Sequence, residues 1–224
     1  MAGFGFNNVG FVAALSYAIG GITPPAPGIN RALQFVAATT GYASLTTPNA
    51  ALGGASWSIR YRVRPDAATG GGYVSSRANG GADKAAIIYN FVANTLEFFD
   101  TNNSTGATVR LALATATPPN GSYYDVEFTY DGATLRGFLN GALSSSIPVV
   151  FTLNALVADL VLGQRNTSGG GESNVTIDYL RETENGAATV TMELNEAAPG
   201  PYVNTGSVGG QLMVFAPAPN SILV

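Results

Sequence analysis

Residues 122–141, SYYDVEFTYDGATLRGFLNG, constrain the fold more than any other part of the chain. They contain two runs in which apolar and polar residues alternate, residues 124–130 and 135–139. Asp131-Gly132 separates the two runs and Asn140-Gly141 follows the second. Such dipeptides beside alternating runs are the strongest short-range signal for a β-hairpin. The stretch therefore predicts an antiparallel hairpin with one buried and one exposed face.

The clearest single strand is predicted for residues 57–64, WSIRYRVR. Its odd-numbered residues from Trp57 to Val63 share one face, and its serine and three arginines share the other. Trp57 is therefore expected in the core. Further short strands are predicted at residues 32–35, 42–45, 73–77, 86–91, 96–99, 109–113, 149–151, 160–163 and 175–180. Short strands separated by turn signals are typical of a β-sandwich or jelly roll.

Composition excludes several classes of function. The 224 residues include no cysteine and no histidine, so thiolate chemistry, Ser-His-Asp triads and Cys-His pairs are ruled out. A net charge of −4 and a single lysine, Lys84, leave no basic patch for phosphates, so nucleic-acid binding is not expected. Residues 11–22 are apolar but too short to span a membrane, and no basic segment precedes them as in a signal peptide.

The ordered series of strands resembles laminin-G-like domains, the concanavalin A-like lectin/glucanase sandwiches. The hairpin at 122–141, the pair ALQF and YASL at 32–45, and the strands at 57–64, 160–163 and 175–180 carry this resemblance. It covers residues 31–183 and implies an all-β fold. The expected architecture is an antiparallel two-sheet β-sandwich, a concanavalin A-like jelly roll, with an N-terminal extended arm.

Residues 1–30 form a separate segment in this prediction. They carry no charge, contain aromatic residues and end in a proline-rich connector, PPAPG. An exposed apolar arm of this kind favours aggregation unless it is covered. It either covers an edge of its own sheet or docks on a neighbouring subunit, and the residues expected at that interface are Phe4, Phe6, Phe11 and Tyr17.

Residues 184–224 form a C-terminal extension. Its segments at 190–196 and 203–212 resemble the element that opens many laminin-G-like domains. Two hypotheses follow. In the first, the extension completes the sandwich as in a partial circular permutation, either within its own chain or in a neighbouring one. In the second, it is an unrelated extra hairpin.

No catalytic site is predicted. The related glucanases place two carboxylates on one strand as E-x-D-x-x-E, and this run is absent here. Asp125 and Glu127 share a strand face, but that face is the solvated one. We therefore expect no enzyme activity and no cofactor. The resemblance implies one candidate ion, calcium, held on the rim near Asp83 and Asn166; the alternative is that both are ordinary turn residues.

Two aromatic residues, Tyr123 and Phe138, are predicted on the face opposite the core of their strands. An exposed ring can stack on a pyranose or anchor a protein interface, and the sequence leaves both uses open.

Two hypotheses for the function follow. The first is a virion structural protein of a bacteriophage, such as a capsid decoration, fibre or tail component on the virion surface. It would assemble with copies of itself and other virion proteins, and would also attach to surface glycans. The alternative is a free, extracellular carbohydrate-binding module or adhesin of lectin type. Neither hypothesis involves a membrane or nucleic acid.

Overall fold

The computed structural model describes residues 32–37, 42–45, 52, 55–67, 72–77, 83–101, 105–153, 159–166, 170–194, 202–203, 205, 207 and 211–215. The chain divides into two units, Met1–Asn30 and Arg31–Val224, and all described residues belong to the second. The predicted interface residues Phe4, Phe6, Phe11 and Tyr17 lie outside the described residues, so the docking arm stays a prediction. Among the described residues, no helix is long and apolar enough to cross a membrane.

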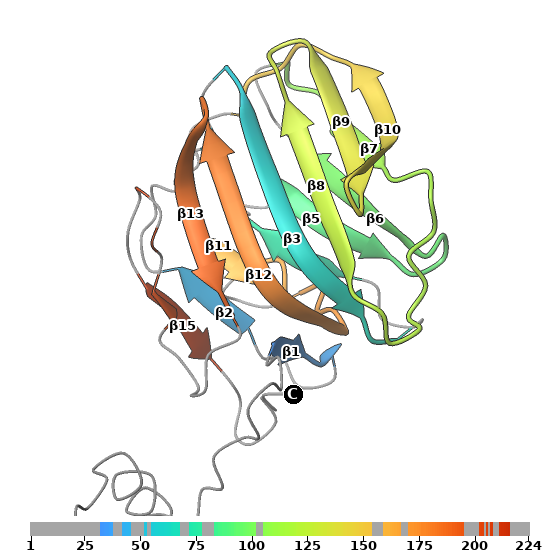
Figure 1. Cartoon of the computed structure of the whole chain (residues 1–224), viewed down its shortest axis with the longest axis vertical. Helices are drawn as coiled ribbons and strands as arrows, with labels where there is room; N and C mark the ends of the chain where they lie inside the picture. Colours follow the sequence, from blue (N-terminus) through green and yellow to red (C-terminus); the bar gives the residue numbers. More distant parts are fainter. Residues whose placement is uncertain are drawn as a thin grey trace, which may run out of the picture. The chain divides into compact units, whose positions relative to one another are not determined.

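The described strands form two antiparallel sheets that face each other (Figure 1). Sheet A has the order β1-β12-β3-β8-β9-β10, with β13 also paired to β12. Its strands are β1 (Leu33–Phe35), β3 (Trp57–Pro65), β8 (Tyr124–Tyr130), β9 (Thr134–Leu139), β10 (Ala142–Pro148), β12 (Val175–Glu184) and β13 (Ala187–Glu193).

Sheet B has the order β14-β15-β2-β11-β4-β5-β6-β7. Its strands are β2 (Tyr42–Leu45), β4 (Tyr73–Ser76), β5 (Ala86–Asn90), β6 (Thr95–Asp100), β7 (Val109–Ala112), β11 (Leu160–Leu162), β14 (Tyr202–Val203) and β15 (Gln211–Phe215). In Figure 1, sheet A lies in front and β2, β5, β6 and β11 of sheet B lie behind it. The predicted all-β two-sheet sandwich is confirmed.

The alternation of β3 sets the division between core and surface. Its burial changes at every residue, and Trp57, Ile59, Tyr61 and Val63 are buried. Trp57 is only 4% exposed, which confirms its predicted place in the core. Its ring packs against Phe98 of sheet B, with ring centroids 5.2 Å apart, and against Tyr130 and Phe151 at 5.7 and 6.1 Å. This aromatic cluster joins the two sheets.

The predicted hairpin is present as β8 and β9. Residues pair from Val126 with Leu139 to Tyr130 with Leu135. Asp131 closes the turn, because its Oδ1 accepts hydrogen bonds from the backbone N–H groups of Ala133 and Thr134 at 3.0 and 2.8 Å.

Two predictions about the second half of the chain need correction. Residues 149–151 do not form a strand; Val149 and Val150 continue the chain beyond β10, and Phe151 enters the aromatic cluster. The prediction also lacked β10, which pairs with β9 and forms an edge of sheet A.

The C-terminal extension contributes strands to both sheets of its own chain. β13 pairs with β12, and β15 pairs with β2. Met192 and Leu194 are fully buried, so this segment is part of the core. Whether the arrangement represents a circular permutation of the usual strand order remains a prediction.

One ion pair crosses the interior between the sheets. Arg77 directly follows β4 of sheet B, and its Nη2 donates to Oε2 of Glu182 on β12 of sheet A. Both side chains are completely buried. Removing one member of such a pair leaves the other charge unpaired in the core.

We expect Trp57→Ala to lower the free energy of unfolding by about 3–5 kcal/mol, because it removes a large buried ring from the aromatic cluster. Denaturant unfolding followed by far-ultraviolet circular dichroism measures this. Val92→Ala is the control, since Val92 is 80% exposed and should change stability by less than about 0.5 kcal/mol. An unchanged midpoint for Trp57→Ala would contradict the packing described here.

For the buried ion pair we expect Arg77→Met to cost about 3–5 kcal/mol, and the double variant Arg77→Met/Glu182→Leu to cost clearly less, because the second change removes the unpaired carboxylate. The same unfolding experiment measures both. With Glu182→Leu measured as well, a double variant as unstable as the sum of the two single variants would contradict direct coupling between the two side chains.

Candidate functional site

The solvent face of sheet A carries a cluster of arginine and tyrosine side chains. Arg60, Arg62 and Arg64 alternate along β3 with its buried residues and therefore point away from the core. Residues of β8 and β12 flank them on both sides; Arg62, for example, lies between Asp125 and Tyr179. We call this surface the arginine–tyrosine face, made of Arg60, Arg62, Arg64, Tyr123, Tyr179, Arg181 and the carboxylates paired with them.

Tyr123, one of the two predicted stacking residues, lies at one end of this face. The guanidinium groups of Arg62 and Arg64 lie 5.4 and 5.3 Å from the centre of its ring. Both distances are within the range of cation–π attraction. The ring is half-buried, and burial raises the pKa of the Tyr123 hydroxyl above its ordinary value. The two arginines thus hold this ring in one orientation at the surface.

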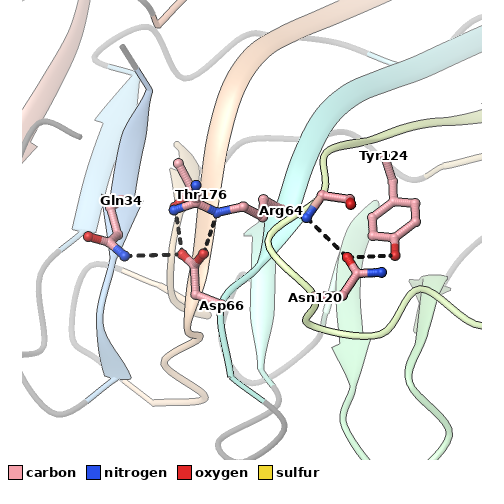
Figure 2. A network of polar contacts seen from close by, with 7 residues as sticks. Gln34, Arg64, Asp66, Asn120, Tyr124 and Thr176 are labelled. Atoms are coloured by element: carbon pink, nitrogen blue, oxygen red, sulfur yellow. Dashed lines mark hydrogen bonds and ion pairs between the residues drawn. The ribbon is translucent and has the colours of Figure 1, made fainter. Parts of the chain in front are cut away.

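Asp66 fixes the position of Arg64 (Figure 2). Arg64 Nε donates to Asp66 Oδ1 at 2.6 Å, and Arg64 Nη2 donates to Thr176 Oγ1 at 3.1 Å. Thr176 Oγ1 in turn donates to Asp66 Oδ2 at 2.5 Å, and Gln34 Nε2 reaches the same oxygen at 3.3 Å. The network joins β1, β3 and β12, so contacts to three strands hold the Arg64 side chain in place.

A second set of contacts supports the loop that precedes Tyr123. Asn120 Oδ1 accepts hydrogen bonds from the backbone N–H of Ser122 at 3.0 Å and from the hydroxyl of Tyr124 at 3.2 Å (Figure 2). Tyr124 also donates to the carbonyl of Pro118. These bonds hold both residues that flank Tyr123 in the chain.

Tyr179 occupies the other side of the face because β12 contains a bulge. The register with β3 shifts between Ile177 and Tyr179, so Asp178 is the extra residue at this point. Tyr179 then lies opposite Arg62, and the chain continues with Leu180 in the core. Uninterrupted alternation from Val175 would have placed Tyr179 inside.

The surroundings of Tyr179 combine a carboxylate and two arginines. Its hydroxyl donates to Asp125 Oδ1 at 2.5 Å, and the guanidinium groups of Arg60 and Arg181 lie 5.7 and 4.9 Å from its ring centre. Burial, together with Asp125, raises the pKa of Tyr179 to about 12. Burial also raises the pKa of Asp178, against the effect of Arg62, whose Nε lies 3.5 Å from its carboxylate.

The charges of the arginine–tyrosine face cancel in pairs. Arg60 lies 3.9 Å from Asp125, Arg62 3.5 Å from Asp178, Arg64 2.6 Å from Asp66 and Arg181 2.7 Å from Glu193. The arginine side chains remain between 21% and 49% exposed. The face therefore offers many donors and acceptors around two tyrosine rings, with a carboxylate beside each arginine, an arrangement suited to neutral, hydroxyl-rich ligands.

Phe138, the second predicted stacking residue, is not part of this face. It lies on β9 between Glu127 of β8 and the exposed Leu143 of β10. Tyr123 is four residues from Glu127 along the chain, which corresponds to about 13 Å at the rise of a β-strand. The two predicted rings therefore do not form one platform.

The predicted calcium residues lie on a rim of loops. Asp83 is buried, and its Oδ1 accepts a hydrogen bond from Arg165 Nε at 2.6 Å. Asn166 follows Arg165 directly, and its carbonyl accepts from Gln164 Nε2 at 2.7 Å. Burial and the neighbouring Asp83 raise the pKa of Tyr73 to about 12. The structure thus brings Asp83 to the 165–166 turn, but with its carboxylate paired to an arginine.

No group of three or more carboxylates that could hold a metal occurs among the described residues. A calcium ion at Asp83 would have to compete with the guanidinium of Arg165. The calcium site stays a prediction. The absence of enzyme activity also stays a prediction. Of the two strand carboxylates considered for catalysis, Asp125 accepts a hydrogen bond from the Tyr179 hydroxyl, and Glu127 lies opposite Arg60.

A family model described as the concanavalin A-like lectin/glucanases superfamily matches residues 39–182. No curated protein matches the sequence.

Several solved structures share the fold at low sequence identity. A Bacteroides ovatus protein described as a candidate carbohydrate binding protein has a TM-score of 0.57 and 12% identity, covering 85% of this chain and 61% of that one. Domains LG4-5 of the mouse laminin alpha1 chain have a TM-score of 0.56 and 16% identity, and the match covers 75% of this chain and 44% of that one. The CBM40 of a Ruminococcus gnavus sialidase, bound to sialyllactose, has a TM-score of 0.50 and 12% identity, and the match covers 69% of this chain and 86% of that one. The chain therefore spans less than two thirds of the first two structures.

We expect Tyr179 to ionise about two pH units above an ordinary tyrosine. Its folded pKa of about 12 lies above the unfolded value of about 10, so its stabilising contribution is complete below pH 10 and is lost as the pH rises towards 12. Titration of phenolate absorbance measures this: Tyr179→Phe should remove one late-ionising group, and Asp125→Asn should shift one towards lower pH. A titration curve that neither variant changes would contradict the hydrogen bond between Tyr179 and Asp125.

Proposed function

Because the chain belongs to the concanavalin A-like lectin/glucanase superfamily, we propose that it is a carbohydrate-binding protein of lectin type without enzyme activity. We propose further that the arginine–tyrosine face of sheet A binds the glycan. The ligand class that suits this face is a neutral oligosaccharide. The likeness to the Bacteroides ovatus protein and to the sialyllactose-bound module supports carbohydrate binding.

The observation that carries this proposal is the fixed, half-exposed ring of Tyr123 beside Arg62 and Arg64. Sugar recognition needs an aromatic ring for the apolar face of a pyranose, and polar groups that bind its hydroxyls. Asp66 and Thr176 hold Arg64, and Asp178 lies beside Arg62, so both arginines are oriented before a ligand arrives. Preorganisation of this kind lowers the entropic cost of binding.

The paired charges favour a neutral ligand. A polyanion would be attracted by the arginines but repelled by the carboxylates beside them, so little net attraction would remain. Hydroxyl groups can instead donate hydrogen bonds to the carboxylates and accept them from the guanidinium groups.

The virion role predicted from the sequence gains no support from the fold or from the comparisons, and no described contact favours it. It stays a prediction, as does the location of the protein, extracellular or on a virion surface.

The test is a glycan array with neutral and sialylated oligosaccharides, followed by calorimetry with the best ligand. We expect binding to neutral glycans and a loss of about tenfold in affinity for Tyr123→Ala, equivalent to about 1.4 kcal/mol. Tyr123→Phe keeps the ring and should bind nearly as well. Phe138→Ala, on the same sheet but outside the face, should bind as the unchanged protein does.

Three outcomes separate the parts of the proposal. An array without any ligand would overturn carbohydrate binding itself. Binding that Tyr123→Ala leaves intact would move the site away from the arginine–tyrosine face. Binding restricted to sialylated glycans would contradict the argument from paired charges.

A further inference from the structure

The interior of the sandwich contains polar groups that the protein itself does not satisfy. They surround the buried pair of Arg77 and Glu182. Tyr61 of β3 and Ser75 of β4 lie beside this pair, since Ser75 is close to the Tyr61 hydroxyl and both members of the pair act on its pKa. Each of the four side chains is at most 1% exposed.

Several atoms of this cluster have no protein partner in the described part of the chain. They are Arg77 Nε and Nη1 and Glu182 Oε1; beside them, Tyr61 Oη and Ser75 Oγ lie close to each other without forming a hydrogen bond of normal geometry. A buried donor or acceptor without a hydrogen bond costs about 1–3 kcal/mol, and nearly all buried polar atoms in folded proteins are bonded. Unpaired groups from three different strands, gathered in one place, therefore indicate a bound molecule.

The chemistry of these atoms selects the class of molecule. The charges of Arg77 and Glu182 already cancel, so an additional ion would be left without a counter-charge in a low-dielectric interior. The arginine supplies donors only, Glu182 Oε1 is an acceptor, and the two hydroxyls can act as either. The bound molecule must therefore be small and neutral, and must both donate and accept. We infer that Tyr61, Ser75, Arg77 and Glu182 enclose a site for ordered water between the two sheets.

This site lies directly beneath the arginine–tyrosine face. Tyr61 is the inward residue between Arg60 and Arg62 on β3, and Glu182 follows Arg181 on β12. Leu180 pairs with Tyr61 and Arg181 with Arg60, so the two strands run side by side here. Water bound on the inner side would hold the backbones of β3 and β12 together where their outer side chains form the face. The inference does not depend on the proposed function.

The first experiment is a crystal structure of the full chain at a resolution that shows ordered water. We expect at least one water molecule within about 3 Å of Arg77 Nε or Nη1 and of Glu182 Oε1 or Tyr61 Oη. Protein side chains bonded to these atoms in place of water, or an anion in contact with Arg77, would overturn the inference.

The second experiment counts long-lived internal water in solution by magnetic relaxation dispersion in oxygen-17-enriched water. Arg77→Met/Glu182→Leu should lose at least one long-lived water per chain relative to the unchanged protein. The matched control is Arg136→Met/Asp131→Leu, which removes an exposed pair and should lose none. An equal count in all three proteins would contradict the inference, and the crystal structure decides the question if the first double variant does not fold.

Discussion

The burial of one face of β3 is the constraint on which the other features depend. Nine consecutive residues alternate between core and surface, so the force that places Trp57, Ile59 and Tyr61 between the sheets also places Arg60, Arg62 and Arg64 in solvent. Apolar burial supplies the stability, and the arginines are oriented as its geometric consequence. The arginines of the arginine–tyrosine face at positions 60, 62 and 64 thus project from one regular strand of sheet A, whereas Tyr123 lies in the segment that leads into β8.

Much of the fold could be predicted from the sequence, because alternating apolar and polar residues and nearby turn residues mark most of its strands. The β8–β9 hairpin, β3 and the core position of Trp57 all follow from alternation and turn residues. β10 could not be found this way, since ALSSSIP is mostly exposed and shows no apolar periodicity. Residues 149–151 look like a strand, but Phe151 is buried by packing against Tyr130 rather than by pairing. In both places tertiary contacts decide the structure.

The candidate site was predictable only in part. Tyr123 was found because a single strand pattern placed it outside the core. Tyr179 was missed because a bulge at Asp178 reverses the alternation of β12, and nothing local in the sequence marks it. The partners of Arg64 show the same limit: Asp66 is two residues away, but Thr176 is more than a hundred residues distant. Such pairs become visible only when the sheet is assembled.

The pairing of β15 with β2 has a consequence for biosynthesis. Leu212 lies opposite Leu45, so β2 acquires this neighbour only after the segment around Leu212 has been synthesised, long after β2 itself. Until then one edge of β2 is exposed, and unpaired strand edges promote association between chains. Pairings between such distant segments also form slowly. The nascent protein therefore depends on β15 to protect this edge, and chains released before β15 is made would be the ones most prone to aggregate.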